Sequence, residues 1–296
     1  MTLRSTSQLH KFMSADRAIK FLKDRTIRFT QPKFLNDPYE CHLTFDRAAR
    51  KIILDDFAKF CRNRSPSLSE KEVHERVSAN EQSLVENALL DYRRIRDDLG
   101  VLSLTEDPLN LLMWAHYGDE HRGIVIELDI THPSLLMTTS GGREFATLCA
   151  VRYTNKKVRG IPRPDTVIQT LITKSPEWEY EREWRFIRTI NLLRKVSDDV
   201  YVADIPPEAI KRVILGARFP AHRLPDVMKH IKDGELKHVV VEKAVMIPNR
   251  FGLKLVDPGK FGWTLLHREH HFAEAAEEAL LCLTMDEDED EDEKVL

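Results

Sequence analysis

The sequence predicts an α+β protein built on a mixed, mainly antiparallel sheet. Segments with strand and helix periodicity alternate irregularly along the 296 residues, without the regular strand–helix–strand rhythm of a parallel α/β fold. The chain has only 11 glycines and contains neither GxGxxG nor GxxxxGK, the patterns of dinucleotide- and phosphate-binding loops. With 42% hydrophobic and 31% charged residues it can bury a core, and no apolar run reaches the roughly 18 residues of a membrane span.

Hydrophobic spacing places the individual elements. Strands are expected at 8–13, 26–30, 101–105, 123–129, 144–153, 237–247 and towards the end of 210–216. Helices are expected at 15–24, 46–62, 69–99, 108–117, 165–173 and 221–233. The two helices between 46 and 99 are predicted to be an insertion that packs on the sheet, with a capping box of Ser69 and Glu72. Pro108 is expected at the first position of its helix.

A single α+β domain is expected over 1–268, followed by two segments of different character. Residues 269–285 place Phe272, Leu280 and Leu283 on one face of an amphipathic helix, which predicts packing against the body or a partner chain. Residues 286–296 begin with DEDEDEDE and predict a disordered, solvating tail. Without those eight acidic residues and Lys294, 44 of the 45 basic and 40 of the 48 acidic side chains remain. This mildly basic body permits a nucleic-acid partner without requiring one.

Cysteine usage and the N-terminus bear on location. The four cysteines are scattered and form no CxxC pair, which indicates reduced thiols and argues against a disulfide scaffold or a zinc ribbon. The first twelve residues lack the apolar core of a signal peptide. The HExxH spacing of metalloproteases is absent, and no zinc site is expected. A cytoplasmic protein without membrane association is predicted.

The most distinctive stretch is KSPEWEYEREWRFIR at 174–188. Its aromatic and charged residues alternate after Pro176, which predicts a half-exposed strand with Glu181, Glu183 and Arg185 on one face. Carboxylates roughly 6.5–7 Å apart on such a face raise one another's pKa, while the guanidinium lowers the pKa of its neighbour. Pairs of carboxylates with separated pKa values carry out acid–base chemistry. An edge strand with cross-strand ion pairs is the structural explanation of the same pattern.

Three sequence boxes together resemble a bacterial family of domains of unknown function. They are FLNDPYE at 34–40, a box at 103–127 that begins SLTEDP and contains MWAHYGD, and KSxxWxYExEWR at 174–185. The family is marked by FNDPFE-like and WxYExEWR-like boxes, and the resemblance covers roughly residues 8–255. It implies no established activity.

The order of elements also resembles ADP-ribosyltransferase folds. These place a His or Tyr on the first strand, an aromatic element on a middle strand–helix unit, and a Glu at the start of a later strand. His10 or Lys11, the unit at 103–117, and Glu181 or Glu183 occupy that order here. The resemblance implies an enzyme that consumes NAD as a substrate, either a transferase or an NAD glycohydrolase. A role in bacterial antiviral defence or stress response is a further expectation, for this enzyme or for a sensor.

The resemblance also implies roles for individual residues. Glu183 is expected to stabilise the oxocarbenium-like transition state, with Glu181 and Arg185 supporting it and His10 contacting ribose or adenine. Trp114 or Tyr117 is expected to stack on a ring of the substrate. The expected substrate-binding set is Lys11, Asn36, Asp37, Glu40, Trp114, His116, Tyr117 and Lys174. The segments 36–40, 114–117 and 181–185 are then predicted to line one pocket.

Two other function classes fit the same residues. A nuclease or phosphodiesterase would hold Mg²⁺ through carboxylates and waters, with Lys174 or Arg185 on the phosphate. The ligands in that reading are Asp37, Glu40, Glu181 and Glu183. A non-catalytic sensor or adaptor would use the boxes for structure and the acidic tail for binding. Loss of NAD, magnesium-dependent cutting of nucleic acid, or neither, separates the three classes.

Overall fold

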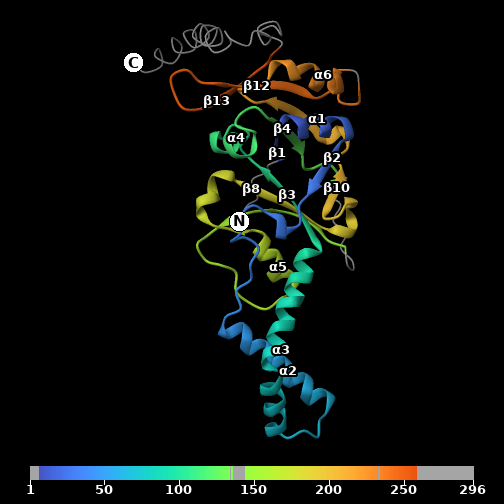
Figure 1. The fold of residues 1–296 in the computed structure, drawn as a ribbon, viewed down its shortest axis with the longest axis vertical. Helices are drawn as coiled ribbons and strands as arrows, with labels where there is room; N and C mark the ends of the chain where they lie inside the picture. Colours follow the sequence, from blue (N-terminus) through green and yellow to red (C-terminus); the bar gives the residue numbers. More distant parts are fainter. Residues whose placement is uncertain (1–6, 134, 136–143, 233, 259–296) are drawn as a thin grey trace, which may run out of the picture.

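The computed structural model describes residues 7–133, 135, 144–232 and 234–258 (Figure 1). The strands are β1 Gln8–Met13, β2 Thr26–Phe29, β3 Leu99–Thr105, β4 Ile124–Asp129, β5 Ala146–Ala150, β6 Arg152–Tyr153, β7 Thr173–Lys174, β8 Glu183–Thr189, β9 Arg194–Ser197, β10 Val200–Asp204, β11 Ile210–Leu215, β12 Val240–Met246 and β13 Leu253–Val256. The helices are α1 Ala15–Asp24, α2 Arg47–Arg64, α3 Glu70–Asp97, α4 Leu111–Tyr117, α5 Pro164–Leu171 and α6 Leu224–Lys232.

The α+β class is confirmed. Eight strands form one sheet in the order β13-β12-β11-β4-β1-β3-β8-β5, and only β11 and β12 run parallel within it. A three-stranded sheet, β2-β10-β9, and the short pair β6-β7 accompany it. The mixed, mainly antiparallel sheet therefore matches the prediction.

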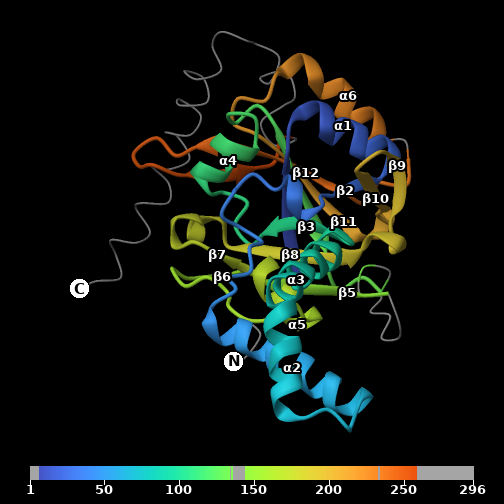
Figure 2. The same ribbon diagram turned by 60° about the horizontal axis from the view of Figure 1, so that its bottom comes forward.

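Alternation of side chains along the strands gives the large sheet two buried faces. Leu9 of β1 belongs to the main core, which includes Phe21 of α1 and Val227 of α6. These two helices lie side by side in both views (Figures 1 and 2). Phe12 faces the opposite way and packs with Trp114 of α4. The sheet is thus the middle layer, with helices on both sides.

The two predicted insertion helices are present, but they do not pack on the sheet. They form a hairpin that extends away from it (Figures 1 and 2). In α2 only Ala49 and Cys61 are buried, and in α3 only Val73 and Tyr92. Only the C-terminal end of α3 reaches the core. The capping box of Ser69 and Glu72 is formed as predicted.

The prediction of a continuous strand over 174–188 is wrong. Pro176 starts a 3-10 helix, Pro176–Glu181, because its fixed φ suits the first turn of a helix. Arg182 follows with φ 43°, a left-handed conformation that ends the turn, and β8 begins only at Glu183. Glu181 therefore lies on the turn and does not share a strand face with Glu183. The alternation of aromatic and charged residues arises here from a turn followed by a strand.

Other boundaries also differ from the predictions. The helix expected from Pro108 begins later, because the Asn110 side chain accepts a hydrogen bond from the Met113 N–H at 3.1 Å and caps α4. The single strand expected over 144–153 is divided into β5 and β6. Strands β9 and β10 were not predicted, and β10 pairs with both β9 and β2.

No helix within the described part of the chain combines the length and the apolar composition needed to cross a membrane. The amphipathic helix predicted at 269–285 and the acidic tail at 286–296 lie outside the described residues.

Gly216 offers a test of the packing around the end of β11. A Cβ added there would lie 2.1 Å from the His121 carbonyl oxygen and 2.9 Å from the Trp114 ring. We expect Gly216→Ala to lower the free energy of unfolding by roughly 1–3 kcal/mol, the usual cost of overpacking. Urea unfolding measures it, with Gly234→Ala as control, because there the nearest atom is 3.4 Å away. Equal stability of the two variants would contradict this packing.

Candidate functional site

The large sheet is forked between β1 and β3. β1 pairs with β4 through all six of its residues, and β3 pairs with β8 through all seven. Between β1 and β3, however, the only register pair is His10 with Thr105. Farther along β3, Val101 exchanges both backbone hydrogen bonds with Thr30, which follows β2. The two middle strands therefore diverge beyond this one register pair.

At this fork, side chains of β1 donate hydrogen bonds to backbone carbonyls of β3. His10 Nδ1 donates to the Thr105 carbonyl at 3.2 Å, and Lys11 Nζ donates to the Ser103 carbonyl at 2.8 Å. Burial is the main reason that the pKa of Lys11 falls to about 8, and Arg17 lowers it further against the opposing charges of Glu183 and Glu181. An amine that titrates this close to neutral pH is available as a base or nucleophile.

A cavity of about 310 Å³ opens at the fork, and we call it the fork cavity. Its volume lies in the range of small-molecule sites. Charged and polar side chains dominate part of its wall: Lys11, Arg17, Asn36, Ser103, Thr105, Tyr117, Lys174, Glu181, Glu183 and Arg185. Apolar side chains, among them Phe12, Phe34, Leu104 and Met113, form the rest. Such a mixed wall fits a ligand with both a charged group and a ring.

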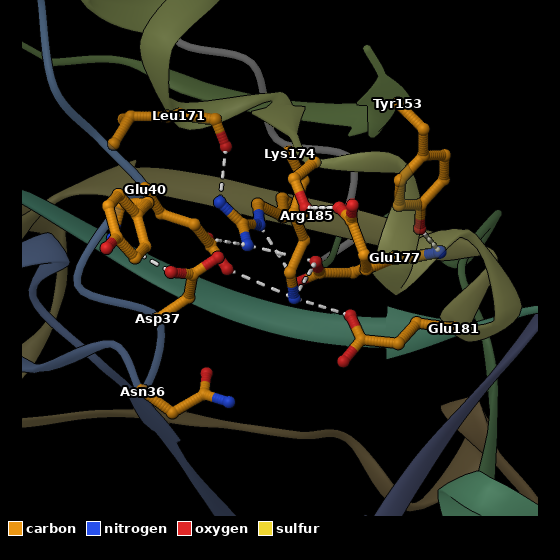
Figure 3. A network of polar contacts seen from close by, with 12 residues as sticks. Asn36, Asp37, Glu40, Tyr153, Leu171, Lys174, Glu177, Glu181 and Arg185 are labelled. Carbon is orange, nitrogen blue, oxygen red and sulfur yellow. Dashed lines mark hydrogen bonds and ion pairs between the residues drawn. The ribbon is translucent and has the colours of Figure 1, made fainter. Parts of the chain in front are cut away.

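Part of this wall belongs to a buried ion cluster of Glu40, Lys174, Glu181, Glu183 and Arg185 (Figure 3). Every member is at most 6% exposed. Lys174 Nζ lies 3.1 Å from Glu40 Oε1, 2.6 Å from Glu181 Oε2 and 3.4 Å from Glu183 Oε2. Arg185 donates to both carboxylate oxygens of Glu183 at 2.8 and 2.9 Å, and it also pairs with Glu40. Two cations thus hold three carboxylates.

The cluster separates the pKa values of its two cavity-facing carboxylates. Burial raises the pKa of Glu183, but Arg185 and Lys174 outweigh it and bring the value down to about 2. Burial also acts on Glu181, and there it prevails over Lys174, so that the pKa of Glu181 is raised. The separation expected from the sequence is present, although burial rather than repulsion between the two is its leading cause. Of the pair, only Glu181 has a pKa shifted towards the working range of an acid or base.

Two of the sequence boxes converge on Glu181 from outside the cluster. Tyr117 Oη donates to Glu181 Oε1 at 2.7 Å, and Asn36 Nδ2 donates to Tyr117 Oη at 3.2 Å. Burial and the Glu181 carboxylate raise the pKa of Tyr117, so that its hydroxyl remains a donor. The Thr105 hydroxyl donates to the Glu181 backbone carbonyl at 2.6 Å. Glu181 is therefore held in position from several sides at the cavity wall.

His10 is held as firmly as Glu181. Its Nε2 lies 3.1 Å from Glu127 Oε2, and its other ring nitrogen is bonded to Thr105. Burial raises the pKa of Glu127, but the hydrogen bond from His10 and the charge of Arg212 lower it overall. Because both nitrogens of His10 already have partners, a direct contact with ribose or adenine would require it to exchange one of them.

Several predicted substrate-binding residues do not reach the fork cavity. Trp114 is fully buried, its ring packs edge-on against Phe12, and its Nε1 donates to the Pro108 carbonyl at 2.8 Å. The expectation that it stacks on a substrate is therefore wrong. His116 hydrogen-bonds to the Tyr180 hydroxyl at 3.0 Å and is absent from the cavity wall. Asp37 and Glu40 line a different cavity. Of the predicted segments 36–40, 114–117 and 181–185, the residues that line the fork cavity are Asn36, Tyr117, Glu181, Glu183 and Arg185.

Three residues of the wall were missed from the sequence. Ser103 and Thr105 alternate along β3 on the side that faces the other box residues, and this period of two was the available signal. Arg17 is exposed on α1 and lines the cavity, and no hydrogen bond or ion pair joins it to another described residue. An exposed arginine on a helix gives no sequence signal of its own.

The proposed Mg²⁺ ligands do not form a metal site. Lys174 Nζ lies among Glu40, Glu181 and Glu183, at the place where a Mg²⁺ ion shared by these carboxylates would bind. Asp37 Oδ1 instead accepts a hydrogen bond from the Tyr39 N–H at 2.8 Å. Within the described ranges no three His, Cys, Asp or Glu side chains are arranged to hold a metal ion. The ion pairing of these carboxylates therefore does not favour the four-carboxylate reading.

The depressed pKa of Lys11 predicts its reactivity. In the folded protein, labelling of Lys11 by a small amine-directed reagent should have its pH midpoint near the pKa of about 8. In the urea-unfolded chain the same lysine should titrate near its ordinary value of 10.5. Because the unfolded state then binds more protons between these two pH values, Lys11 makes folding more favourable as pH rises through that window. Mass spectrometry after brief acetylation measures the labelling of Lys11 in the folded and the unfolded protein. Identical pH midpoints in the two states would refute the burial of this amine.

Comparison with known proteins supports the resemblance drawn from the boxes. No curated protein and no solved structure matches the chain. A family model does match, over a stretch that runs from α4 to β8 and so contains Tyr117, Lys174, Glu181 and Glu183. A domain described as "Protein of unknown function (DUF2971)" is found at residues 113–186 of this chain.

Proposed function

We propose that the fork cavity binds NAD and that the protein cleaves its nicotinamide–ribose bond, either as an ADP-ribosyltransferase or as an NAD glycohydrolase. The presence of both charges on the cavity wall supports this proposal. Lys11 and Arg17 come from β1 and α1, whereas Glu181, at the end of the 3-10 helix before β8, meets Tyr117 of α4. NAD carries an anionic pyrophosphate and a cationic nicotinamide ring, so it offers a partner to each kind of group.

The residue roles follow from this match. Arg17, which has no protein partner among the described residues, and Lys11 bind the pyrophosphate by charge-assisted hydrogen bonds. Glu181, which is oriented by Tyr117, faces the cationic nicotinamide ring of the bound NAD. Glu183 was expected to be the catalytic carboxylate, but Arg185 engages both of its oxygens. We therefore propose that Glu183 positions Arg185 and that Glu181 is the catalytic carboxylate.

The reaction can be written with these groups alone. The bond between C1′ of the ribose and the pyridinium nitrogen breaks, and its electron pair returns to nicotinamide, which leaves as a neutral base. The oxocarbenium-like centre at C1′ is stabilised by the Glu181 carboxylate. Water or an acceptor hydroxyl then attacks C1′ and gives its proton to Glu181. The raised pKa of Glu181 suits this acceptance of a proton.

A binding role without turnover is the second candidate, and the ion cluster favours it. All five members are buried and paired, as expected of a cluster that holds a binding site in shape. In that case NAD or a related nucleotide occupies the fork cavity and is not consumed, as in a sensor or adaptor. A cytoplasmic location and a role in bacterial defence or stress response form part of the proposal, in keeping with the free thiols of Cys41, Cys61 and Cys149.

The test follows free nicotinamide during incubation of the full chain with NAD. We expect release by the wild type and a fall of roughly 100-fold or more in Glu181→Gln, which loses the charge that stabilises the transition state. Glu179→Gln is the matched control, because Glu179 lies on the same 3-10 helix but is exposed. Its activity should equal that of the wild type.

Calorimetric titration with NAD separates loss of chemistry from loss of binding. Glu181→Gln should still bind NAD, because Lys11 and Arg17 are intact. Binding without any nicotinamide release in the wild type would select the sensor reading. Release that is equal in Glu181→Gln and the wild type, or a complete lack of NAD binding, would refute the assigned site.

A further inference from the structure

A second cavity, of about 180 Å³, lies on the other side of the ion cluster from the fork cavity. Glu40 lines this second cavity, Glu181 and Glu183 line the fork cavity, and Lys174 lines both. Figure 3 shows Asp37 and Glu40 on one side of Lys174 and Arg185, and Glu181 on the other. The ion cluster is therefore a wall shared by two cavities.

The FLNDPYE box is divided between the two cavities. Phe34, Leu35 and Asn36 line the fork cavity, whereas Asp37, Tyr39 and Glu40 line the second cavity. The proposed NAD chemistry uses only the first half of the box. The second half has no role in it, so the second cavity needs its own explanation.

The buried part of the second cavity presents hydrogen-bond acceptors. Asp37 and Glu40 are 9% and 6% exposed. Glu40 is committed to the ion cluster, with its Oε1 3.1 Å from Lys174 Nζ, whereas Asp37 pairs with no described cation and accepts from the Tyr39 N–H at 2.8 Å. A largely buried carboxylate is stabilised by further hydrogen bonds, which a ligand that brings a donor, such as a hydroxyl, supplies.

The open part of the second cavity presents the opposite chemistry. Lys156 and Lys157, on the loop after β6, are exposed and line the cavity. Tyr39 is 72% exposed, and Lys157 Nζ lies 5.3 Å from the centre of its ring. Two ammonium groups suit a phosphate, and an exposed aromatic ring offers a flat surface for a base.

We propose that the second cavity is a binding site for a nucleoside monophosphate. A ribose hydroxyl donates to the Asp37 carboxylate, the phosphate is held by Lys156 and Lys157, and the base stacks on Tyr39. This arrangement places donors against the buried acceptors and the negative charge at the open, cationic end. The site is separate from the fork cavity, and the proposal holds whether or not NAD is cleaved there.

The test titrates AMP and ribose 5-phosphate into the full-length protein by calorimetry. Lys156→Glu/Lys157→Glu should bind AMP at least about tenfold more weakly, because two charge-assisted contacts become repulsive. The control Lys51→Glu/Lys71→Glu changes the same charge at exposed positions on the α2–α3 hairpin and should bind like the wild type. All four lysines are exposed, so folding is kept.

Two further variants locate the ligand within the molecule. Tyr39→Ala should weaken AMP binding to the level of ribose 5-phosphate and leave ribose 5-phosphate binding unchanged, because only AMP carries a base. Arg17→Glu alters the fork cavity and should leave AMP binding unchanged. Absence of saturable AMP binding would overturn the proposal, as would AMP binding that is lost in Arg17→Glu and kept in Lys156→Glu/Lys157→Glu. Nicotinamide release is measured separately, so failure of one proposal is distinguished from failure of the other.

Discussion

The position of Lys174 among three buried carboxylates is the interaction on which the site depends. Removing one partner of a buried ion pair typically costs about 3–5 kcal/mol, because the remaining charge stays out of water. Each member of the ion cluster is thus held by the others. Since Arg185 is committed to Glu183 and Glu40, Lys174 is the member of the ion cluster that pairs with Glu181. The least compensated carboxylate is therefore the one beside Tyr117 at the cavity wall.

The same cluster links the fork of the sheet to both cavities. Glu183 is paired in register with Thr105, and Thr105 is paired with His10, so these residues form a row across β8, β3 and β1. This row marks the only point at which β1 and β3 meet in register, and the fork cavity begins there. On the far side, Glu40 and Lys174 form the wall of the second cavity.

Local features of the sequence predicted the local structure well. The capping box of Ser69 and Glu72 formed because its two partners are three residues apart and need nothing else from the fold. The strand prediction over 174–188 was wrong because aromatic and charged residues alternate in the same way across a 3-10 helix that begins at Pro176 and the strand that follows it. Trp114 was mistaken for a stacking residue because its burial depends on Phe12, which lies a hundred residues away in the chain. The fork itself depends on strand pairing at long range, and no local pattern announces it.

The most direct test of the account is an NMR titration of the isotope-labelled protein with NAD, following the backbone amides of His10, Ser103 and Thr105. These residues border the fork cavity from both of the diverging strands. The account predicts saturable shift changes at these amides with a single affinity, and their loss in Arg17→Glu. Amides that remain unchanged at saturating NAD would contradict the claim that the forked sheet is the NAD site.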